Sequence, residues 1–360
     1  MSLLDSPLWL ADVDGTVVAL PDLESLSGRS VLVTGATGLI ASAVVDILGR
    51  WNVIHPDASP IRVVVAGRSK DRALDRFAPF TRDPWFSFAF FDASANTGDS
   101  PSADFVLHAA GNASPSKIVR EPVETMLSHF WGLKRLLDAA RTHGSKRVLF
   151  VSSSEVYGKK SGDAPFREDE YGWIDLLAPR NSYSVAKRAA ETLGTAFADE
   201  YGMEFVVARP GHIYGPTAAL DDNRVSSAWP FAVTRGEDIV MKSEGTQLRS
   251  YCHCLDCASA LLTVLLRAPA GHAFNISNPD SVLSIRSMAR ILADAGGVAL
   301  RLELPTDAER KGFNPMPNSS LDASSLLALG WTGRWDAPRG FARTVEILRS
   351  IASRERSAHA

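Results

Sequence analysis

The 360-residue sequence is poor in cysteine, has no long apolar run and carries a net charge of only −3. No run approaches the roughly eighteen apolar residues of a membrane-spanning helix, and residues 1–28 lack the basic start and apolar core of a signal peptide. The near balance of charges leaves no basic surface of the kind that binds nucleic acid or an anionic membrane. We therefore expect a cytoplasmic protein that binds neither nucleic acid nor membranes.

All three cysteines fall in the segment Cys252-His-Cys-Leu-Asp-Cys257, too close together to join distant parts of a fold by disulfides. A zinc site is one interpretation of this Cys/His cluster, but zinc sites usually draw their ligands from two separated knuckles. The sequence favours buried thiols at the end of a strand and no metal site.

A glycine-spaced turn opens the recognisable part of the chain, in the segment Val31-Leu-Val-Thr-Gly-Ala-Thr-Gly-Leu-Ile-Ala41. Residues 31–33 are typical of a short buried strand, and the apolar period continues as a helix after the turn. A helix start presents unpaired N–H groups and the positive end of its dipole, and small residues let a phosphate approach closely. This context predicts the pyrophosphate site of a dinucleotide. The expected contacts are Gly35, Thr37, Gly38, Leu39 and Ile40.

Strands and helices alternate along the first 210 residues. We expect a long amphipathic helix over 121–143, with Met126, Phe130, Leu133, Leu136 and Leu137 on one side. Further strands are expected at 61–66, 85–91, 105–108 and 147–151. The alternation predicts an α/β fold, a doubly wound parallel (Rossmann) sheet with a smaller α/β substrate-binding lobe at the C-terminal end.

The expected division of the chain follows from this alternation and from the irregular pattern after residue 215. We expect an N-terminal extension over 1–29, the cofactor-binding domain over 30–215 with a return to it at about 250–280, a substrate-binding lobe mainly over 216–348, and a polar tail over 349–360.

Residues at the ends of later strands bear on the cofactor. Ala109 and Ala110 follow the fourth strand, where small residues let a flat cofactor lie against the backbone. Arg68 follows the second strand, which in such units faces the adenosine ribose; an arginine there accommodates the extra phosphate of NADP, and an acidic residue favours NAD. A solvated surface arginine is the alternative, so the sequence leaves NAD and NADP both open.

Two segments carry residues suited to catalysis. The first, Val151-Ser-Ser-Ser-Glu-Val-Tyr-Gly158, leaves the fifth strand at its carboxyl end, where ligands of parallel sheets bind. In the second, Ser182-Tyr-Ser-Val-Ala-Lys187, a four-residue step places Tyr183 and Lys187 one turn apart on the same helix face. A lysine charge near a phenol favours the phenolate, so Tyr183 could take a proton from a sugar hydroxyl while a nicotinamide takes the hydride.

The TGxxGxxA, His-Ala-Ala, SSSEVYG and YxxxK elements, in this order, resemble the extended short-chain dehydrogenase/reductase family. Within it they resemble the sugar-nucleotide epimerases, dehydratases and decarboxylases, over about residues 30–348. The resemblance implies a tightly bound NAD or NADP, an NDP-sugar substrate with UDP-sugars favoured, and a homodimer formed by the helices that contain Phe130 and Tyr183.

The resemblance also implies roles for single residues. Ser153 matches the hydroxyl that hydrogen-bonds the reacting sugar oxygen, Tyr183 the base, and Lys187 the residue that lowers the pKa of that base and holds the cofactor ribose. Asp92 and Ala93 match the adenine contact. The segment Gln247-Leu-Arg-Ser-Tyr251 resembles the one whose arginine, here Arg249, binds the sugar nucleotide.

Glu155 bears most on the type of reaction. The family's decarboxylases and 4,6-dehydratases carry a glutamate at this position, whereas a 4-epimerase needs none. Many dehydratases have an acidic aspartate just before it, where this chain has Ser154. The run Ser-Ser-Glu-Val-Tyr-Gly, and the run Asp221-Asp-Asn-Arg-Val-Ser-Ser227 that contains Arg224, resemble UDP-glucuronate decarboxylases. GDP-mannose 4,6-dehydratases also have serine before the glutamate, so dehydration and epimerisation stay open, as does a solvated position for Glu155.

His129 and His212 stand where the family usually has asparagine. Each is either a packed, hydrogen-bonded histidine or, for His212, a contact to the pyrophosphate or sugar. The favoured reaction is C4 oxidation followed by loss of the C6 carboxylate, from UDP-glucuronate to UDP-xylose, with Ser154, His212, Arg224 and Arg249 in contact with the substrate. A non-catalytic NAD(P)-binding sensor is the alternative of another class, which the complete set of Ser153, Tyr183 and Lys187 disfavours.

Overall fold

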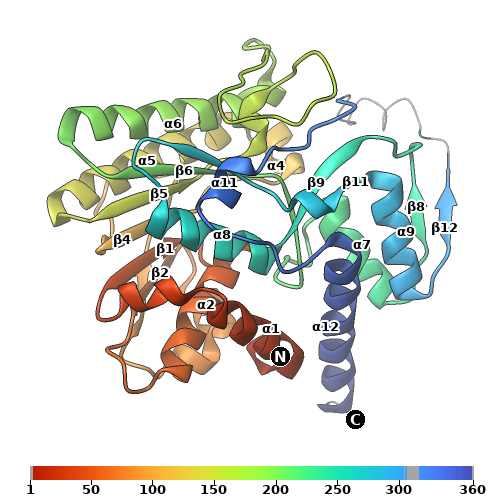
Figure 1. Ribbon diagram of the computed structural model, residues 1–360, viewed down its shortest axis with the longest axis horizontal. Helices are drawn as coiled ribbons and strands as arrows, with labels where there is room; N and C mark the ends of the chain where they lie inside the picture. Colours follow the sequence, from red (N-terminus) through yellow and green to blue (C-terminus); the bar gives the residue numbers. More distant parts are fainter. Residues whose placement is uncertain (1–2, 304, 306–315, 359–360) are drawn as a thin grey trace.

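The glycine-spaced turn lies at the middle of a parallel sheet in the computed structural model, which describes residues 3–303, 305 and 316–358 (Figure 1). In these residues seven strands form the sheet in the order β10-β6-β5-β4-β1-β2-β3, and every neighbouring pair is parallel. Chain order reverses between β1 and β4, the switch point at which open parallel sheets bind ligands. The strands are β1 (Ser30–Thr34), β2 (Arg62–Gly67), β3 (Phe86–Phe90), β4 (Phe105–His108), β5 (Arg147–Val151), β6 (Phe205–Pro210) and β10 (Ala273–Ile276).

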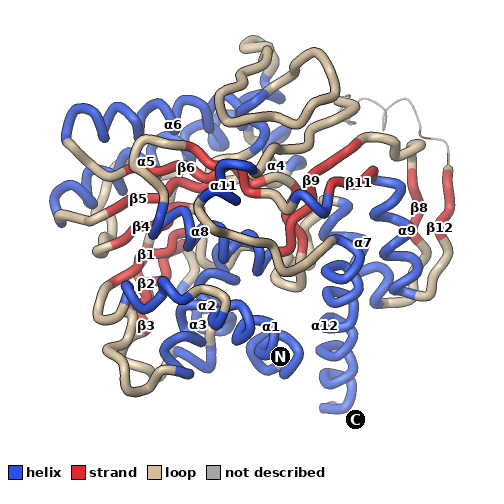
Figure 2. Tube along the Cα trace, in the orientation of Figure 1, coloured by secondary structure: helices blue, strands red, loops and turns tan. Residues whose placement is uncertain are grey.

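Helices cover both faces of this sheet, as Figure 2 shows. On one face Val31, Val33 and Leu107 pack in a common core with α2 (Leu39–Ile54) and α8 (Cys254–Arg267). On the other face the alternate residues Leu32 and Val106 pack with α5 (Pro122–His143) and α6 (Ser182–Tyr201). Short helices α3 (Lys70–Arg76) and α4 (Pro115–Arg120) lie in the connections. The doubly wound parallel sheet predicted from the alternation is confirmed.

One face of the long helix differs from the prediction. Leu133, Leu136 and Leu137 of α5 are buried against the sheet, but Met126 and Phe130 are 40% and 36% exposed. The apolar residues predicted to share one side of the helix therefore lie on two surfaces, one facing the sheet and one facing away from it.

A smaller region follows β6 and has its own core. Within the described residues, β7 (His212–Tyr214), β9 (Leu248–His253) and β11 (Val282–Ser284) form one sheet, and β8 (Ile239–Met241) pairs with β12 (Leu300–Leu302). Tyr214, Tyr251 and Phe341 pack together at its centre. Its helices are α7 (Val225–Thr234), α9 (Ile285–Gly296), α11 (Ser324–Ala328) and α12 (Ala337–Ala358).

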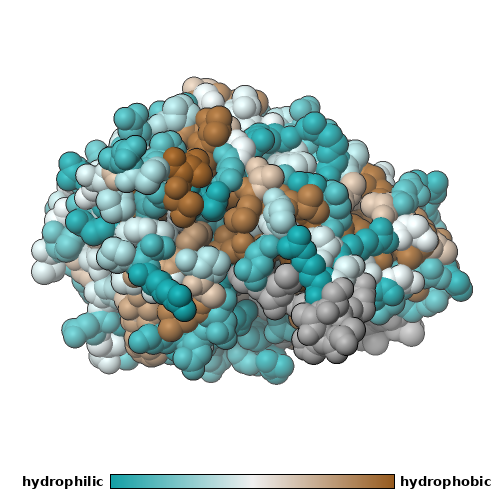
Figure 3. Space-filling view, turned by 90° about the horizontal axis from the view of Figure 1, so that it is seen from below, coloured by the Kyte–Doolittle hydropathy of each residue, from teal (hydrophilic) through white to brown (hydrophobic). Residues whose placement is uncertain are grey.

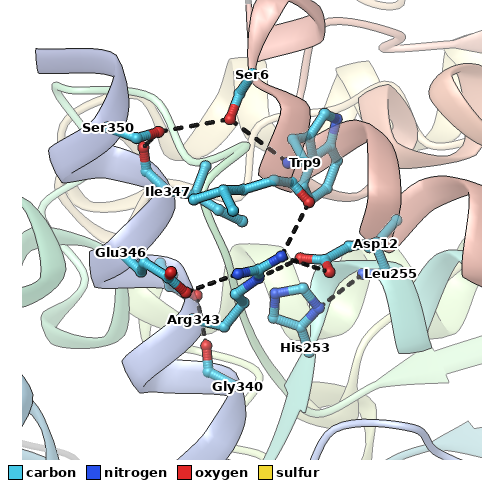
Figure 4. Close-up of polar contacts among 12 residues, drawn as sticks. Ser6, Trp9, Asp12, His253, Leu255, Gly340, Arg343, Glu346, Ile347 and Ser350 are labelled. Carbon is cyan, nitrogen blue, oxygen red and sulfur yellow. Dashed lines mark hydrogen bonds and ion pairs between the residues drawn. The ribbon is translucent and has the colours of Figure 1, made fainter.

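The two ends of the chain pack against each other. Helix α1 (Pro7–Val18) lies between α2 and α12, near the N and C labels in Figure 1. Trp9 donates a 2.9 Å hydrogen bond to the buried Asp46 of α2. On the other side Asp12 accepts hydrogen bonds from Arg343 of α12, as Figure 4 shows. The N-terminal segment that the sequence left unassigned is thus part of the fold, and the expected polar tail is helical as far as Ala358; residues 1–2 and 359–360 lie outside the described part.

The cysteines and the surface agree with the composition. Cys252, Cys254 and Cys257 are free and buried, at the end of β9 and the start of α8, as predicted. The described residues contain no His/Cys/Asp/Glu group arranged to hold a metal ion. They also contain no helix long and apolar enough to span a membrane. Figure 3 shows one face that is largely hydrophilic and interrupted by small hydrophobic patches.

Candidate active site

The turn after β1 leaves space that only small residues allow. Gly35 has φ of +65°, and a Cβ there would lie 2.9 Å from the backbone of Ala109 and Ala110, so a larger residue would collide with the end of β4. Gly38 begins α2 without a side-chain cap, so the first N–H groups of the helix stay open to a ligand. Thr37, Leu39 and Ile40, the other residues expected here, are partly exposed around this helix start.

A second group lies at the ends of β2 and β3. Arg68 is exposed, and its charge acts on Asp92. Partial burial raises the pKa of Asp92, but hydrogen bonds from Ser94 and the charges of Arg68 and Arg135 outweigh burial and hold it below its usual value. Ala93 is buried against α5. Arg68 and the Asp92–Ala93 pair thus lie together at the expected edge.

Contacts connect the turn to Tyr183. Beyond Ala110, Gly111 is pressed against the ring of His129, and this ring lies 5.2 Å from the Tyr183 ring, centre to centre. His129 Nε2 hydrogen-bonds the carbonyl oxygen of Asn112 at 3.1 Å, whereas its Nδ1 has no partner among the described residues. Burial, with the charge of Lys187, lowers the pKa of His129, so the ring is neutral near pH 7. His129 is therefore a packed, hydrogen-bonded histidine.

Tyr183 lies beside Ser153, as the two motifs require. Burial raises the pKa of the Tyr183 phenol to about 12, while a hydrogen bond with Ser153 and the charge of Arg224 act in the opposite direction. Glu155 raises it further. The result is opposite to the lowering that we expected from Lys187, because burial of the phenol outweighs the charges around it.

Lys187 is hydrogen-bonded to β5, the strand that lies behind it. Its Nζ donates a 2.7 Å hydrogen bond to the carbonyl oxygen of Val151 and lies 4.5 Å from the centre of the Phe150 ring. The distance from Nζ to the centre of the Tyr183 ring is 5.9 Å. Burial lowers the pKa of Lys187 to about 7, and the charge of Glu191 acts against this shift. The amine therefore loses its proton at a lower pH than an ordinary lysine does.

Glu155 lies on the exposed side of the group formed by Ser153, Tyr183 and Lys187. We call this exposed side, with Glu155, Ser184 and Arg180, the mouth of the site. Its Oε2 accepts a 3.1 Å hydrogen bond from the Ser184 hydroxyl, next to Tyr183 in the chain. Arg180, in the short helix η5 (Pro179–Asn181), places Nη1 3.7 Å from the same oxygen. Ser154 is half-buried in the short helix η4 (Ser154–Tyr157). The Glu155 carboxylate is exposed, as in the solvated alternative, and its charge also acts on the Tyr183 phenol.

Arg224 and Arg249 lie near His212, and we call these three residues the positive wall after the two arginine charges. Burial, with the charges of Arg249 and Arg224, lowers the pKa of His212 to about 3, so the imidazole is neutral. Arg224 donates two hydrogen bonds to the Asp222 carboxylate, of 2.9 and 2.5 Å. Arg249 is buried and donates to two backbone carbonyls, with no carboxylate partner within the described part of the chain. A buried guanidinium without a counter-ion is suited to an anionic ligand.

A comparison with protein families then identifies the family to which the chain belongs. The model described as "NAD dependent epimerase/dehydratase family" matches residues 31–277. The chain belongs to this family.

Members of this family that resemble the chain differ in their reactions. UDP-glucuronic acid decarboxylase 6 of Arabidopsis thaliana is 31% identical over 253 residues, which cover 70% of each chain. A dTDP-glucose 4,6-dehydratase of an Actinoplanes species is 29% identical over 332 residues, 90% of this chain and 98% of its own. The chain spans about half, 47%, of a trifunctional UDP-glucose 4,6-dehydratase of Arabidopsis thaliana, to which it is 27% identical.

Solved structures of the family agree with the fold. The UDP-glucose 4-epimerase of Thermotoga maritima has a TM-score of 0.74 at 23% identity, covering 90% of this chain and 99% of its own. MoeE5, solved in complex with UDP-glucose and NAD, has a TM-score of 0.70 at 26% identity, with coverage of 90% and 99%.

A buried hydrogen-bond network lies behind the site. It is outside the motifs quoted in the sequence analysis, and sequence reasoning missed it. Ser152 donates a 2.5 Å hydrogen bond to Glu191, and Glu191 binds Arg209 through two contacts of 3.0 and 2.7 Å. Arg209 also donates to the hydroxyl of Tyr157 at 3.1 Å. The network therefore holds both ends of the segment that carries Ser153 and Glu155. A signal was present: Glu191 follows Lys187 by the same four-residue step that joins Tyr183 to Lys187.

Proposed function

We propose that the protein oxidises C4 of an NDP-sugar with bound NAD and then removes the C6 carboxylate, as in the conversion of UDP-glucuronate to UDP-xylose. The observation that carries the proposal is the meeting of Ser153, Tyr183 and Glu155 at one place, with Ser154 where an acid would serve dehydration. The 31% identity to a UDP-glucuronic acid decarboxylase supports it.

The residues around the turn fit a dinucleotide. The space at Gly35 and the uncapped start of α2 suit the pyrophosphate, and Asp92 with Ala93 suits the adenine edge. We propose NAD rather than NADP, because the family is NAD dependent and the Arg68 charge is shared with Asp92. Bound NAD would accept the hydride from C4 and later return it, while the O4 proton would leave through the Tyr183 hydroxyl to water and come back by the same route.

The hydroxyls of Ser153 and Tyr183 suit the second half of the reaction. Once C4 is a ketone, the substrate is a β-keto acid, and the C5–C6 bond breaks with loss of CO2. The electron pair passes into an enolate whose charge collects on O4. A Tyr183 phenol with a pKa of about 12 is protonated, so it can donate to O4 together with Ser153 and stabilise that charge. A proton from water then adds to C5 in place of the carboxylate that left.

The positive wall suits the rest of the substrate. We propose that Arg249 and Arg224 bind the pyrophosphate by forked hydrogen bonds and that neutral His212 donates a further one. The large sheet would then serve as the cofactor-binding domain and the region after residue 215 as the substrate-binding lobe, with the boundaries given above.

A 4,6-dehydratase is the second candidate. The dTDP-glucose 4,6-dehydratase relative matches this chain over 98% of its own length, further than the decarboxylase does. In that reaction Glu155 would remove the C5 proton and another group would protonate the departing C6 oxygen. Ser154 is a poor acid for that step.

Product analysis separates the candidates. Purified protein is incubated with UDP-glucuronate, and CO2 and the nucleotide product are measured by mass spectrometry. We expect CO2 and UDP-xylose. A 4-keto-6-deoxy product from dTDP-glucose or UDP-glucose, without CO2 release, would establish dehydration instead. The variant Glu155→Gln separates an epimerase, which should keep its activity, from both.

We also propose a homodimer through α5. Besides Met126 and Phe130, Val123 and Leu127 on this helix are 61% and 41% exposed. Exposed apolar side chains along one helix are typical of a protein interface. Light scattering of the purified protein measures the assembly directly.

A further inference from the structure

One guanidinium group at the mouth has no role in the account above. Arg180 lies three residues before Tyr183 and 3.7 Å from the Glu155 carboxylate, a distance longer than a hydrogen bond. The two side chains are 49% and 42% exposed, and exposed ion pairs of this kind add little to folding stability. Structure alone therefore gives no reason for an arginine here, whereas a ligand entering the mouth would meet it.

The other arginines of the site are engaged elsewhere. Arg224 is held by both carboxylate oxygens of Asp222. Arg249 is buried with its donors on the carbonyl oxygens of Leu248 and Met316. Neither forms an ion pair with Glu155 among the described residues. Arg180 is therefore the cation that faces this carboxylate.

The proposed reaction brings a second carboxylate to the same place. If the C4 oxygen lies between Ser153 and Tyr183, the C6 carboxylate lies two bonds beyond C4, close to Glu155, whose charge acts on the same phenol. Two carboxylates a few ångströms apart repel each other strongly unless a cation lies between them. A guanidinium can bind a carboxylate through two parallel hydrogen bonds, which a single ammonium cannot do.

We propose that Arg180 binds the C6 carboxylate of a uronic acid substrate and so selects acidic sugars over neutral ones. Glu155 holds the guanidinium near Tyr183 through the 3.7 Å contact, and the substrate carboxylate then accepts hydrogen bonds from the remaining N–H groups of Arg180. The inference rests on the proposed function, since only a decarboxylase needs to bind this group.

A pair of ligands that differ only by the carboxylate tests the inference. Dissociation constants of UDP-glucuronate and UDP-xylose are measured by calorimetry for the wild type and for Arg180→Gln. We expect Arg180→Gln to weaken UDP-glucuronate binding by about 10- to 100-fold, the usual effect of losing a charged hydrogen bond, and to leave UDP-xylose binding unchanged. Arg180→Lys should fall between the two, because it keeps the charge and loses the fork.

Two further variants sharpen the result. Glu155→Gln removes the repelling charge but keeps an amide oxygen that can accept a hydrogen bond from Arg180, so it should bind UDP-glucuronate several-fold more tightly than the wild type does while it loses turnover. Arg167→Gln is the matched control, since Arg167 is an exposed arginine with a similarly loose 3.6 Å ion pair, to Asp169. It should change neither dissociation constant.

The outcomes distinguish the inference from the function on which it rests. If the wild type releases CO2 from UDP-glucuronate but Arg180→Gln weakens both ligands equally, or neither, the decarboxylase stands and the role of Arg180 is wrong. If the wild type binds UDP-xylose but neither binds nor decarboxylates UDP-glucuronate, both fail.

Discussion

The site contains the same three residue types twice, once inside the protein and once at the mouth. The inner set is Ser152, Glu191 and Arg209, and the outer set is Ser184, Glu155 and Arg180. In the inner set the serine and arginine contacts to the glutamate measure 2.5 and 2.7 Å, and the Arg209 side chain is 2% exposed. In the outer set they measure 3.1 and 3.7 Å.

The difference shows that burial gives two sets of the same residue types different roles. Away from water each inner charge must have a partner, so the inner set is fully bonded and holds Ser152 and Tyr157 in place around the catalytic segment. At the mouth water satisfies whatever the protein does not, so the outer charges remain available to a ligand. The inner set holds the catalytic segment in position, whereas the outer set can bind a substrate and so discriminate between substrates.

The largest expected effect comes from breaking the inner pair. Glu191→Gln leaves Arg209 as a buried, poorly compensated charge, which should lower the free energy of unfolding by about 3–5 kcal/mol. Glu155→Gln, the matched change at the mouth, should alter it by less than about 1 kcal/mol. Urea denaturation followed by circular dichroism measures both. Equal losses in the two variants would show that burial does not separate the sets.

Local sequence patterns were enough to predict part of the fold and of the candidate site, but not the contacts between distant elements. The strands β1 to β5 and the turn at Gly35 follow from short apolar runs and glycine spacing, which are local signals. The contact between Glu191 and Arg209 joins two elements whose packing no local pattern reveals. The same holds for α1, whose Trp9 meets Asp46 across 37 residues. The pKa of Tyr183 could not be anticipated because burial, invisible in the sequence, decides its direction.

Lys187 should give the inner region a distinctive pH dependence. Its pKa is about 7 in the folded protein against an ordinary value of 10.5, so between these pH values the unfolded chain binds a proton that the folded protein does not. Stability conferred through this group therefore rises with pH across that window, by at most about 1.4 kcal/mol per pH unit. Lys187→Met should remove this part of the slope.

Unfolding free energies of the wild type and Lys187→Met between pH 7 and pH 10 provide the measurement. The titratable groups that face Lys187 are Glu191, on its own helix, and His108 and His129, which are on β4 and α5 and are neutral in the fold. Because both proteins share these groups, the difference between the two curves isolates the lysine. Parallel curves would mean that Lys187 stays charged in the fold.

Removing the inner hydroxyl should have a moderate effect. Ser152→Ala removes one of the two hydrogen bonds to Oε1 of the buried Glu191 and leaves the one from Arg209 Nε, and we expect a loss of about 1–3 kcal/mol. The substitution should also lower kcat, because Ser152 adjoins Ser153. A lower kcat at unchanged KM would indicate that the catalytic segment has moved, and an unchanged kcat would confine Ser152 to stability.

The smallest effect on stability should come from the outer hydroxyl. Ser184→Ala removes the same kind of hydrogen bond to a glutamate, but water can replace it at the mouth, so unfolding should change by less than about 0.5 kcal/mol. Glu155 would then be held only by the loose contact to Arg180, and its carboxylate would sample more positions. We expect the change to appear in the KM for UDP-glucuronate rather than in the melting temperature. If Ser184→Ala instead destabilised the protein as much as Ser152→Ala does, the mouth would be as closed as the interior, and the distinction on which substrate selection by Arg180 depends would disappear.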